Sequence, residues 1–139
     1  MPVSKLKELP KGGDGRWPIC GVGFRSAHWG DLEVGYTDTD VGNHSALYEG
    51  LPGGLCPCPH YGYMFSGRLR CHYPNSDYED EVAETGDVYF FRPGHVLIYE
   101  EPTEALEMNP AGALQDLMDH IENKVAKMLE NGEVPGAVS

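Results

Sequence analysis

Residues 60–69 read HYGYMFSGRL, two short apolar stretches joined by the pair Ser66-Gly67. Glycine accepts the positive φ of a tight turn, so a Ser-Gly pair between two such stretches predicts a β-hairpin. A second stretch, GDVYFFRPGH at residues 86–95, has the same character and closes with the turn-forming pair Pro93-Gly94. Both stretches therefore predict short strands that end in defined turns.

The same pattern continues outward along most of the chain. From Cys20 to Arg92, short stretches rich in β-branched and aromatic residues alternate with Gly, Asn, Asp and Pro. Short strands at a spacing of about 8–12 residues are typical of an all-β barrel or sandwich. The predicted strands are residues 19–24, 32–37, 44–49, 61–65, 68–73, 80–83, 87–91, 96–100 and 105–108.

One long helix is predicted at the C-terminal end. Asn109 has the character of an N-cap, Pro110 suits the first helical position, and Gly132 suits the C-cap. Apolar residues recur between them at helical spacing: Leu114, Leu117, Met118, Ile121, Val125, Met128 and Leu129. This apolar stripe must pack either on the barrel or against a second copy of the chain.

The domain organisation follows from these elements. The chain has 139 residues, which indicates one domain large enough to bury a core. Residues 1–18 are polar and rich in Pro and Gly, and we expect a poorly ordered N-terminal arm there. Residues 19–108 form the predicted barrel, and residues 109–139 the helix and a fraying tail.

The charge and the cysteine content limit the classes of partner and the location. The chain carries 22 acidic and 10 basic residues, a formal net charge of -12. This charge disfavours nucleic acid and anionic membrane surfaces as partners.

No run of about 18 apolar residues is present, so no transmembrane helix is predicted. The N-terminus has no apolar block of the secretory type, so we expect a cytoplasmic protein with its four cysteines reduced.

The stretch Cys56-Pro57-Cys58-Pro59-His60 holds the residue types that bind zinc or a similar metal. In an extended strand Cys56, Cys58 and His60 would share one face, with the outer pair roughly 13 Å apart. The prolines cannot donate to a sheet, so a bent segment that curls the three donors around one point is expected. The sequence therefore predicts Cys56, Cys58 and His60 as metal ligands.

A fourth ligand must come from another part of the chain. His95, in the turn after the strand 87–91, is the first candidate, followed by His44 and then by Glu100 or Glu101. Zinc is the metal expected first because of the thiolates, and iron(II) second. Two other interpretations stay open: a reactive thiol pair, and inert residues packed at the barrel mouth.

Catalytic groups other than the metal are less well defined by the sequence. Alternation turns half of the strand aromatics inward, and an inward tyrosine such as Tyr63 could bind a substrate or donate a proton. Glu100 and Glu101 follow an apolar strand, so one of them would point inward if that strand continues. An inward carboxylate would be a ligand or a general base.

The strand and turn pattern resembles the cupin superfamily, a group of double-stranded β-helix, or jelly-roll, barrels. Residues 60–69 are similar to the first cupin motif, and residues 86–95 to the second. The usual set of three histidines and one glutamate is not reproduced: His60 stands at the glutamate position, and Leu97 at the last histidine position. A variant group of small bacterial cupins, with Cys-x-Cys-Pro-His and Pro-Gly-His, is more similar. The resemblance implies a small-molecule ligand and a homodimer.

Three functions are consistent with these features. The first is a metal-dependent enzyme that acts on a small organic molecule inside the barrel. The second is a non-catalytic cupin, with a structural zinc or no metal, that binds a small molecule as a sensor or carrier. The third is a thiol redox or metal-handling protein. A fold that supports many chemistries does not select among them.

Overall fold

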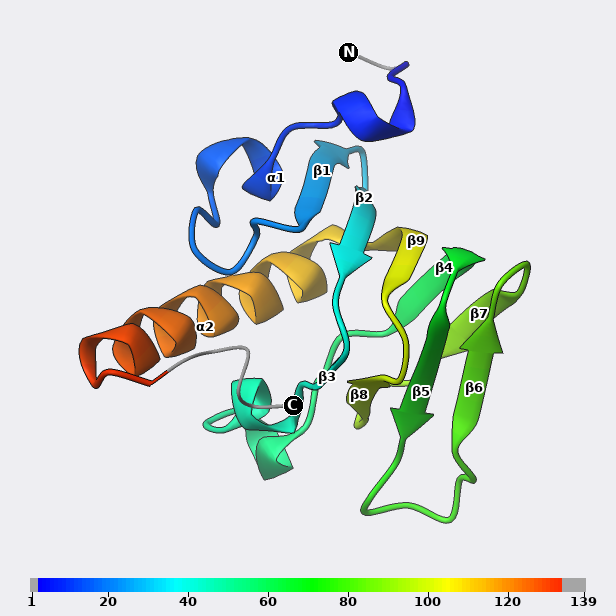
Figure 1. Cartoon of the computed structure of the whole chain (residues 1–139), viewed down its shortest axis with the longest axis vertical. Coiled ribbons are helices and arrows are strands. Elements are labelled where there is room, and N and C mark those ends of the chain that lie inside the picture. Colours follow the sequence, from blue (N-terminus) through cyan, green and yellow to red (C-terminus); the bar gives the residue numbers. More distant parts are fainter. Residues whose placement is uncertain (1–2, 134–139) are drawn as a thin grey trace.

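The computed structural model describes residues 3–133 and, within them, shows nine strands in two antiparallel sheets and one long helix, α2 (Figure 1). The first sheet has the strand order β1-β2-β9-β4-β7, and the second has the order β3-β8-β5-β6. The strands are β1 Phe24–Trp29, β2 Leu32–Thr39, β3 Gly42–Asn43, β4 His60–Ser66, β5 Arg68–His72, β6 Glu81–Glu84, β7 Val88–Phe91, β8 Val96–Tyr99 and β9 Thr103–Pro110. The α-helices are α1 Gly12–Gly15 and α2 Ala111–Glu130, and the 3₁₀ helices are η1 Leu6–Glu8, η2 Ser45–Tyr48 and η3 Pro52–Gly54.

The core lies between the two sheets. Met64 of β4 and Ala105 of β9, from the first sheet, share one buried cluster with Leu69 and Cys71 of β5 from the second. Alternation explains the choice of residues, because in β5 the buried positions are every second one. The expected all-β barrel with one C-terminal helix is therefore confirmed.

The turn at Ser66-Gly67 is present, but the predicted hairpin is wrong. β4 pairs with β7 and β9, whereas β5 pairs with β6 and β8, so the turn carries the chain from one sheet to the other. Gly67 has a φ of 108°, and a Cβ there would lie 2.4 Å from the carbonyl oxygen of Pro102. Glycine is required because this corner packs directly on the backbone that leads into β9.

Two predicted strands are also wrong. Residues 19–24 are mostly turns, and the strand begins only at Phe24, where β1 pairs with β2. Residues 44–49 contain the 3₁₀ helix η2 instead of a strand. Both errors arise because pairing partners, not local composition, decide which extended segments join a sheet.

Helix α2 covers one end of the barrel. Its stripe residues Leu114, Leu117 and Met118 are buried in one cluster with Trp17, Tyr48 and Val96, so the stripe packs within the chain. The predicted end is correct, since Gly132 has a φ of 75° and the N–H of Glu133 bonds the carbonyl of Met128 at 2.8 Å, a Schellman motif. The predicted start is wrong, because Asn109 and Pro110 are the last residues of β9.

The N-terminal segment is packed rather than poorly ordered. Leu9 and Trp17 are 2% and 1% exposed, and the indole N–H of Trp17 donates to Asp119 of α2 at 2.9 Å. Arg16 bonds the fully buried carboxylate of Glu33 on β2 at 2.6 Å. This segment therefore joins β2 to α2 (Figure 1). The domain limits at residues 18 and 108 stay predictions, and the expected fraying at residues 134–139 lies outside the described residues.

Candidate metal centre

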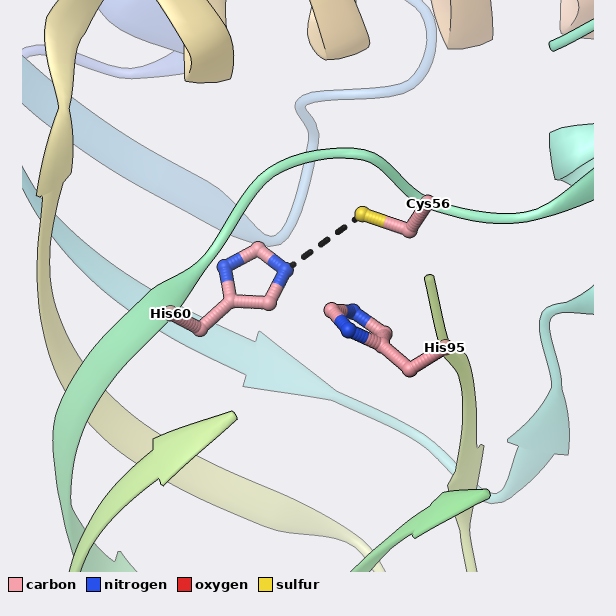
Figure 2. Close-up of side chains that lie close together, drawn as sticks. All are labelled: Cys56, His60 and His95. Carbon is pink, nitrogen blue, oxygen red and sulfur yellow. Dashed lines mark hydrogen bonds between the residues drawn. The ribbon is translucent and has the colours of Figure 1, made fainter. Parts of the chain in front are cut away.

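Three potential metal ligands converge at the end of the barrel that α2 covers. Cys56, His60 and His95 are buried, and each offers one atom that lies within 4.8 Å of the other two. Figure 2 shows the two imidazole rings and the thiol turned toward one another. The thiol Sγ of Cys56 lies 3.6 Å from Nε2 of His60. Zinc bonds of about 2.3 Å to sulfur and about 2.0 Å to nitrogen place two such ligands about 3.5 Å apart at the tetrahedral angle.

The backbone brings Cys56 to His95 directly. The N–H of Cys56 donates to the carbonyl of His95 at 2.9 Å, and the N–H of Gly94 donates to the carbonyl of Cys56 at 2.8 Å. This short bridge joins the segment before β4 to the turn before β8. His60 is the first residue of β4, so the proline-containing bend between it and Cys56 closes the group.

His95 presents a lone pair that has no partner. Its Nδ1 lies 2.5 Å from the carbonyl oxygen of Arg92, and because a carbonyl can only accept, Nδ1 carries the proton. In the neutral ring Nε2 is therefore the nitrogen without a proton, and it is buried without a hydrogen-bond partner. A buried acceptor without a partner is costly, and a bond to a metal ion would satisfy it.

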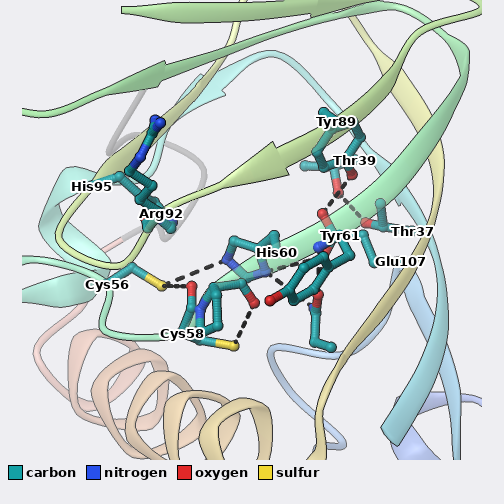
Figure 3. Close-up of polar contacts among 12 residues, drawn as sticks. Thr37, Thr39, Cys56, Cys58, His60, Tyr61, Tyr89, Arg92, His95 and Glu107 are labelled. Atoms are coloured by element: carbon teal, nitrogen blue, oxygen red, sulfur yellow. Dashed lines mark hydrogen bonds and ion pairs between the residues drawn. The ribbon is translucent and has the colours of Figure 1, made fainter. Parts of the chain in front are cut away.

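His60 is held by the carboxylate of Glu107 on β9, which is 13% exposed. Its Nδ1 lies 3.2 Å from Oε1 of Glu107, and the amide nitrogen of Asn109 donates to the same oxygen at 2.9 Å. The hydroxyl of Tyr89 donates to Oε2 of Glu107 at 2.6 Å (Figure 3). Gly62 makes this contact possible, since a Cβ there would lie 2.5 Å from the Tyr89 oxygen. A carboxylate behind a histidine is the usual support for a metal-binding imidazole.

Charge is distributed along this chain of contacts. Burial alone would raise the pKa of the Cys56 thiol, but the contact with His60 lowers it. Burial would lower the pKa of His60, but Glu107 and Cys56 raise it to about 10. Burial would raise the pKa of Glu107, but His60 lowers it to about 2. These shifts together favour a thiolate, an imidazolium and a carboxylate side by side, and a metal that binds His60 would displace one proton from it.

Replacing Glu107 with glutamine is expected to weaken metal binding about 10- to 100-fold, the usual effect of losing the group behind a ligating histidine. Glutamine keeps the size of the side chain but removes the charge that holds the proton on Nδ1. Competition against a chromophoric chelator measures the affinity. The matched control is Glu104→Gln, on the same strand but outside the cluster, where the affinity should stay unchanged. Equal affinities for both variants would contradict this role for Glu107.

A cavity of about 420 Å³ adjoins the cluster at His60. His60, Glu107, Tyr48 and Tyr99 are among the residues that line it. Helix α2 contributes an apolar part of the lining: Leu114, Leu117, Met118 and Ile121. The volume suits a small organic molecule, and the lining is apolar with a few polar groups near the candidate ligands, as is common in binding sites.

The other residues predicted for the site lie elsewhere. Cys58 is buried but outside the cluster, because its Sγ turns to the carbonyl of Pro59 at 3.3 Å. The backbone carbonyl of Cys58, not its thiol, faces Cys56, at 3.7 Å from Sγ. The bend therefore does not place the two thiols on one face, as an extended strand would. His44 lines the cavity with its ring 4.6 Å from that of Tyr99, and it is not a member of the cluster.

The predicted catalytic residues are on the outside of the barrel. Tyr63 is 37% exposed and packs edge-on against Phe65 on the outer face of the first sheet. Glu100 bonds Arg68 and Arg70, and Glu101 is exposed, because β8 ends at Tyr99. The strand therefore ends too early to turn either glutamate inward, and these three candidates are not brought to the site.

The inward carboxylate is Glu107, which the sequence reasoning missed. The signal was present: Ala105, Glu107 and Asn109 alternate with Leu106 and Met108 in β9. A buried Ala105 fixes the phase of the strand and turns Glu107 and Asn109 to the same side. The sequence alone does not show which face of β9 points inward, because both faces of the strand carry apolar residues.

Two solved structures show what the fold of this chain is similar to. An RmlC-like cupin from Shewanella frigidimarina aligns with a TM-score of 0.50 and 14% identity, over 79% of this chain and 90% of the other. The chain has the cupin fold. A protein with a double-stranded β-helix domain from Klebsiella pneumoniae aligns with a TM-score of 0.48 and 16% identity, over 81% and 91% of the two chains. At 14% identity the likeness to the Shewanella structure establishes the fold alone.

No protein-family model and no curated protein matches this chain. Its candidate ligands, one thiol and two imidazoles, differ from the three histidines and one glutamate of the common cupin site. The likeness to the variant group with Cys-x-Cys-Pro-His stays a prediction. Among residues 3–133 no helix is both long and apolar enough to cross a membrane.

Proposed function

We propose that this cupin binds a divalent metal through Cys56, His60 and His95 and acts on a small organic molecule in the adjoining cavity. Zinc is the first candidate and iron(II) the second, because a thiolate with two imidazoles suits zinc best. The buried, unpartnered Nε2 of His95 is the observation that carries the proposal. It faces a thiol and a second imidazole whose Nδ1 is already held by Glu107.

The number of ligands favours chemistry over a purely structural role. Structural zinc sites use four protein ligands, whereas catalytic sites use three and leave one position open. Cys58, the nearest candidate for a fourth ligand, lies outside the cluster. A metal with an open position lowers the pKa of bound water or polarises a carbonyl group. The cavity reaches His60, so a bound molecule would lie next to that position.

The side chains around the cavity would orient the molecule. The leucines and Met118 of α2 offer an apolar wall for its body, and Tyr48 and Tyr99 carry hydroxyls. Burial lowers the pKa of His44 to about 4, so this imidazole is neutral at pH 7 and can donate or accept a hydrogen bond. Glu107 keeps the Nδ1 proton of His60 in place, which leaves Nε2 for the metal.

The metal content of the protein tests this proposal. Protein purified without a metal-chelating tag should contain about one zinc or iron per chain by elemental analysis. Dialysis against a strong chelator should remove the metal, and addition of Zn²⁺ should restore one equivalent. Chelated protein that does not take up Zn²⁺ or Fe²⁺ at micromolar concentration would refute the metal site. A fast-reacting Cys56 in such a protein would favour the thiol function instead.

The proposed partner and location follow from the charge and the cysteines. A small molecule rather than nucleic acid is consistent with the net charge of -12. All four cysteines are free in the structure, which supports a reducing compartment such as the cytoplasm.

A further inference from the structure

The cavity beside His60 has an acidic lining without lysine or arginine. Within the part of the chain that the structure describes, its lining includes the carboxylate residues Asp38, Asp40 and Glu107 and no lysine or arginine. The other histidine of the lining, His44, is neutral at pH 7 because burial lowers its pKa to about 4. A bound molecule therefore meets no basic side chain except the candidate ligand His60.

The positive charge at the candidate metal centre is already balanced by the chain. His60 lies 3.6 Å from the thiol of Cys56 through Nε2 and 3.2 Å from the carboxylate of Glu107 through Nδ1. A divalent ion would add two positive charges, and a thiolate with a carboxylate would offset both. A carboxylate or phosphate group on a ligand would therefore find no net positive charge at this end of the cavity.

The arginines that could bind an anion are engaged elsewhere. Salt bridges hold four of them against carboxylates that do not line the cavity: Arg16, Arg68, Arg70 and Arg92. Asp38 and Asp40, in contrast, form no ion pair among residues 3–133. Their carboxylates are therefore left available to a positively charged ligand.

Aromatic rings add a second source of attraction for a cation. Phe24, Tyr48 and Tyr99 line the cavity, and Tyr48 and Tyr99 are only 2% and 7% exposed. The face of an aromatic ring attracts an ammonium group, and the attraction is stronger where water is excluded. The apolar side chains of α2 suit the rest of an organic molecule but offer nothing to a second charge.

We infer that the molecule taken by the cavity is an organic cation, a small ammonium compound with an apolar body. This inference rests on the proposed function, because it names the ligand class of the same cavity. The ammonium group would be held by aromatic faces and by the unpaired carboxylates, and the body would lie on the side chains of α2. Organic carboxylates and phosphates are excluded by charge.

Three probes of similar size and different charge test the ligand class. They are benzyltrimethylammonium, the neutral 2-phenylethanol and the anion 3-phenylpropanoate, titrated by calorimetry into the full-length protein with and without one equivalent of Zn²⁺. The quaternary ammonium has no lone pair and cannot bind the metal, whereas the carboxylate can. The cation should nevertheless bind about 10-fold more tightly than the anion, with the alcohol between them.

A double variant tests whether the lining is the cause. Asp38→Asn with Asp40→Asn removes two negative charges and should lower the ratio of cation to alcohol affinity about 3-fold or more. The matched control, Asp77→Asn with Glu79→Gln, removes two charges from exposed residues that do not line the cavity. Its ratio should equal that of the wild type. Circular dichroism of both variants checks that the fold is retained.

Three results would overturn the inference. The first is a wild type that binds the anion as tightly as the cation, or that does not bind the cation at millimolar concentration. The second is an unchanged ratio in the Asp38 and Asp40 variant. The third is an equal loss in the control, which would assign the preference to the net charge of the chain. A protein that takes up no Zn²⁺ but still prefers the cation would refute the metal site alone and support the ligand class.

Discussion

Replacing Cys56 with serine is expected to reduce metal affinity by more than about 100-fold. This loss is larger than the one expected for Glu107→Gln, which removes only the group behind a ligand. Replacing Cys58 with serine should leave the affinity unchanged. The two residues are separated by one proline and are equally buried, but only Cys56 lies in the cluster. Serine retains the size of each side chain and removes the thiolate that a soft or borderline metal prefers.

The measurement is competition of each purified variant against a chromophoric chelator, with zinc and with cobalt(II). Cobalt(II) adds a spectroscopic test, because a thiolate ligand gives an intense charge-transfer band in the near ultraviolet. That band should be present in Cys58→Ser and absent in Cys56→Ser. A reversed pattern would show that the bend rearranges on binding and that Cys58 is the ligand. Circular dichroism of both metal-free variants checks that the fold is retained.

Replacing Trp17 with alanine is expected to destabilise the protein by about 3–5 kcal/mol, the range for large buried aromatic side chains. Trp17 is 1% exposed and packs in one cluster with Leu114 and Leu117 of α2. Its indole N–H also donates to Asp119. Loss of the ring would leave a cavity between the N-terminal segment and the helix, and it would leave one hydrogen bond unmade.

Urea unfolding followed by circular dichroism measures this change. Val22→Ala is the matched control, because Val22 lies in the same part of the chain but is 81% exposed, and its replacement should change stability by no more than about 0.5 kcal/mol. Equal stabilities for Trp17→Ala and wild type would mean that residues 3–18 behave as the loose arm expected from composition. A loss of the predicted size would show that the segment belongs to the folded unit.

Local pattern was a good guide to most strands and to α2. β4, β5 and β7 show apolar alternation or turn residues within a few positions, and α2 shows an apolar stripe that only a helix can bury. The local sequence pattern failed where pairing with another strand decides the structure. β1 contains Arg25, Ser26 and His28 and is extended because it pairs with β2. The Ser66-Gly67 turn looked like a hairpin but joins two sheets.

The candidate site shows the same division. The residue types Cys56, His60 and His95 could be selected from sequence because thiolate and imidazole carry a recognisable chemistry. The exclusion of Cys58 could not, since it depends on the direction in which a proline-rich bend turns. Glu107 comes from β9, 47 positions after His60, and its distance to that imidazole exists only once β4 and β9 pair.

Two kinds of information therefore shape this protein. Periodicity, turn residues and donor chemistry are properties of neighbouring residues. The amino-acid sequence alone therefore predicts an acidic β-barrel, a C-terminal helix and a thiol-imidazole centre. Contacts between distant segments decide which donors meet and which carboxylate supports them. They also decide which face of a sheet stays exposed. Those contacts arise from strand register and helix packing, whose free energy is shared across the whole core and is not encoded in any single stretch.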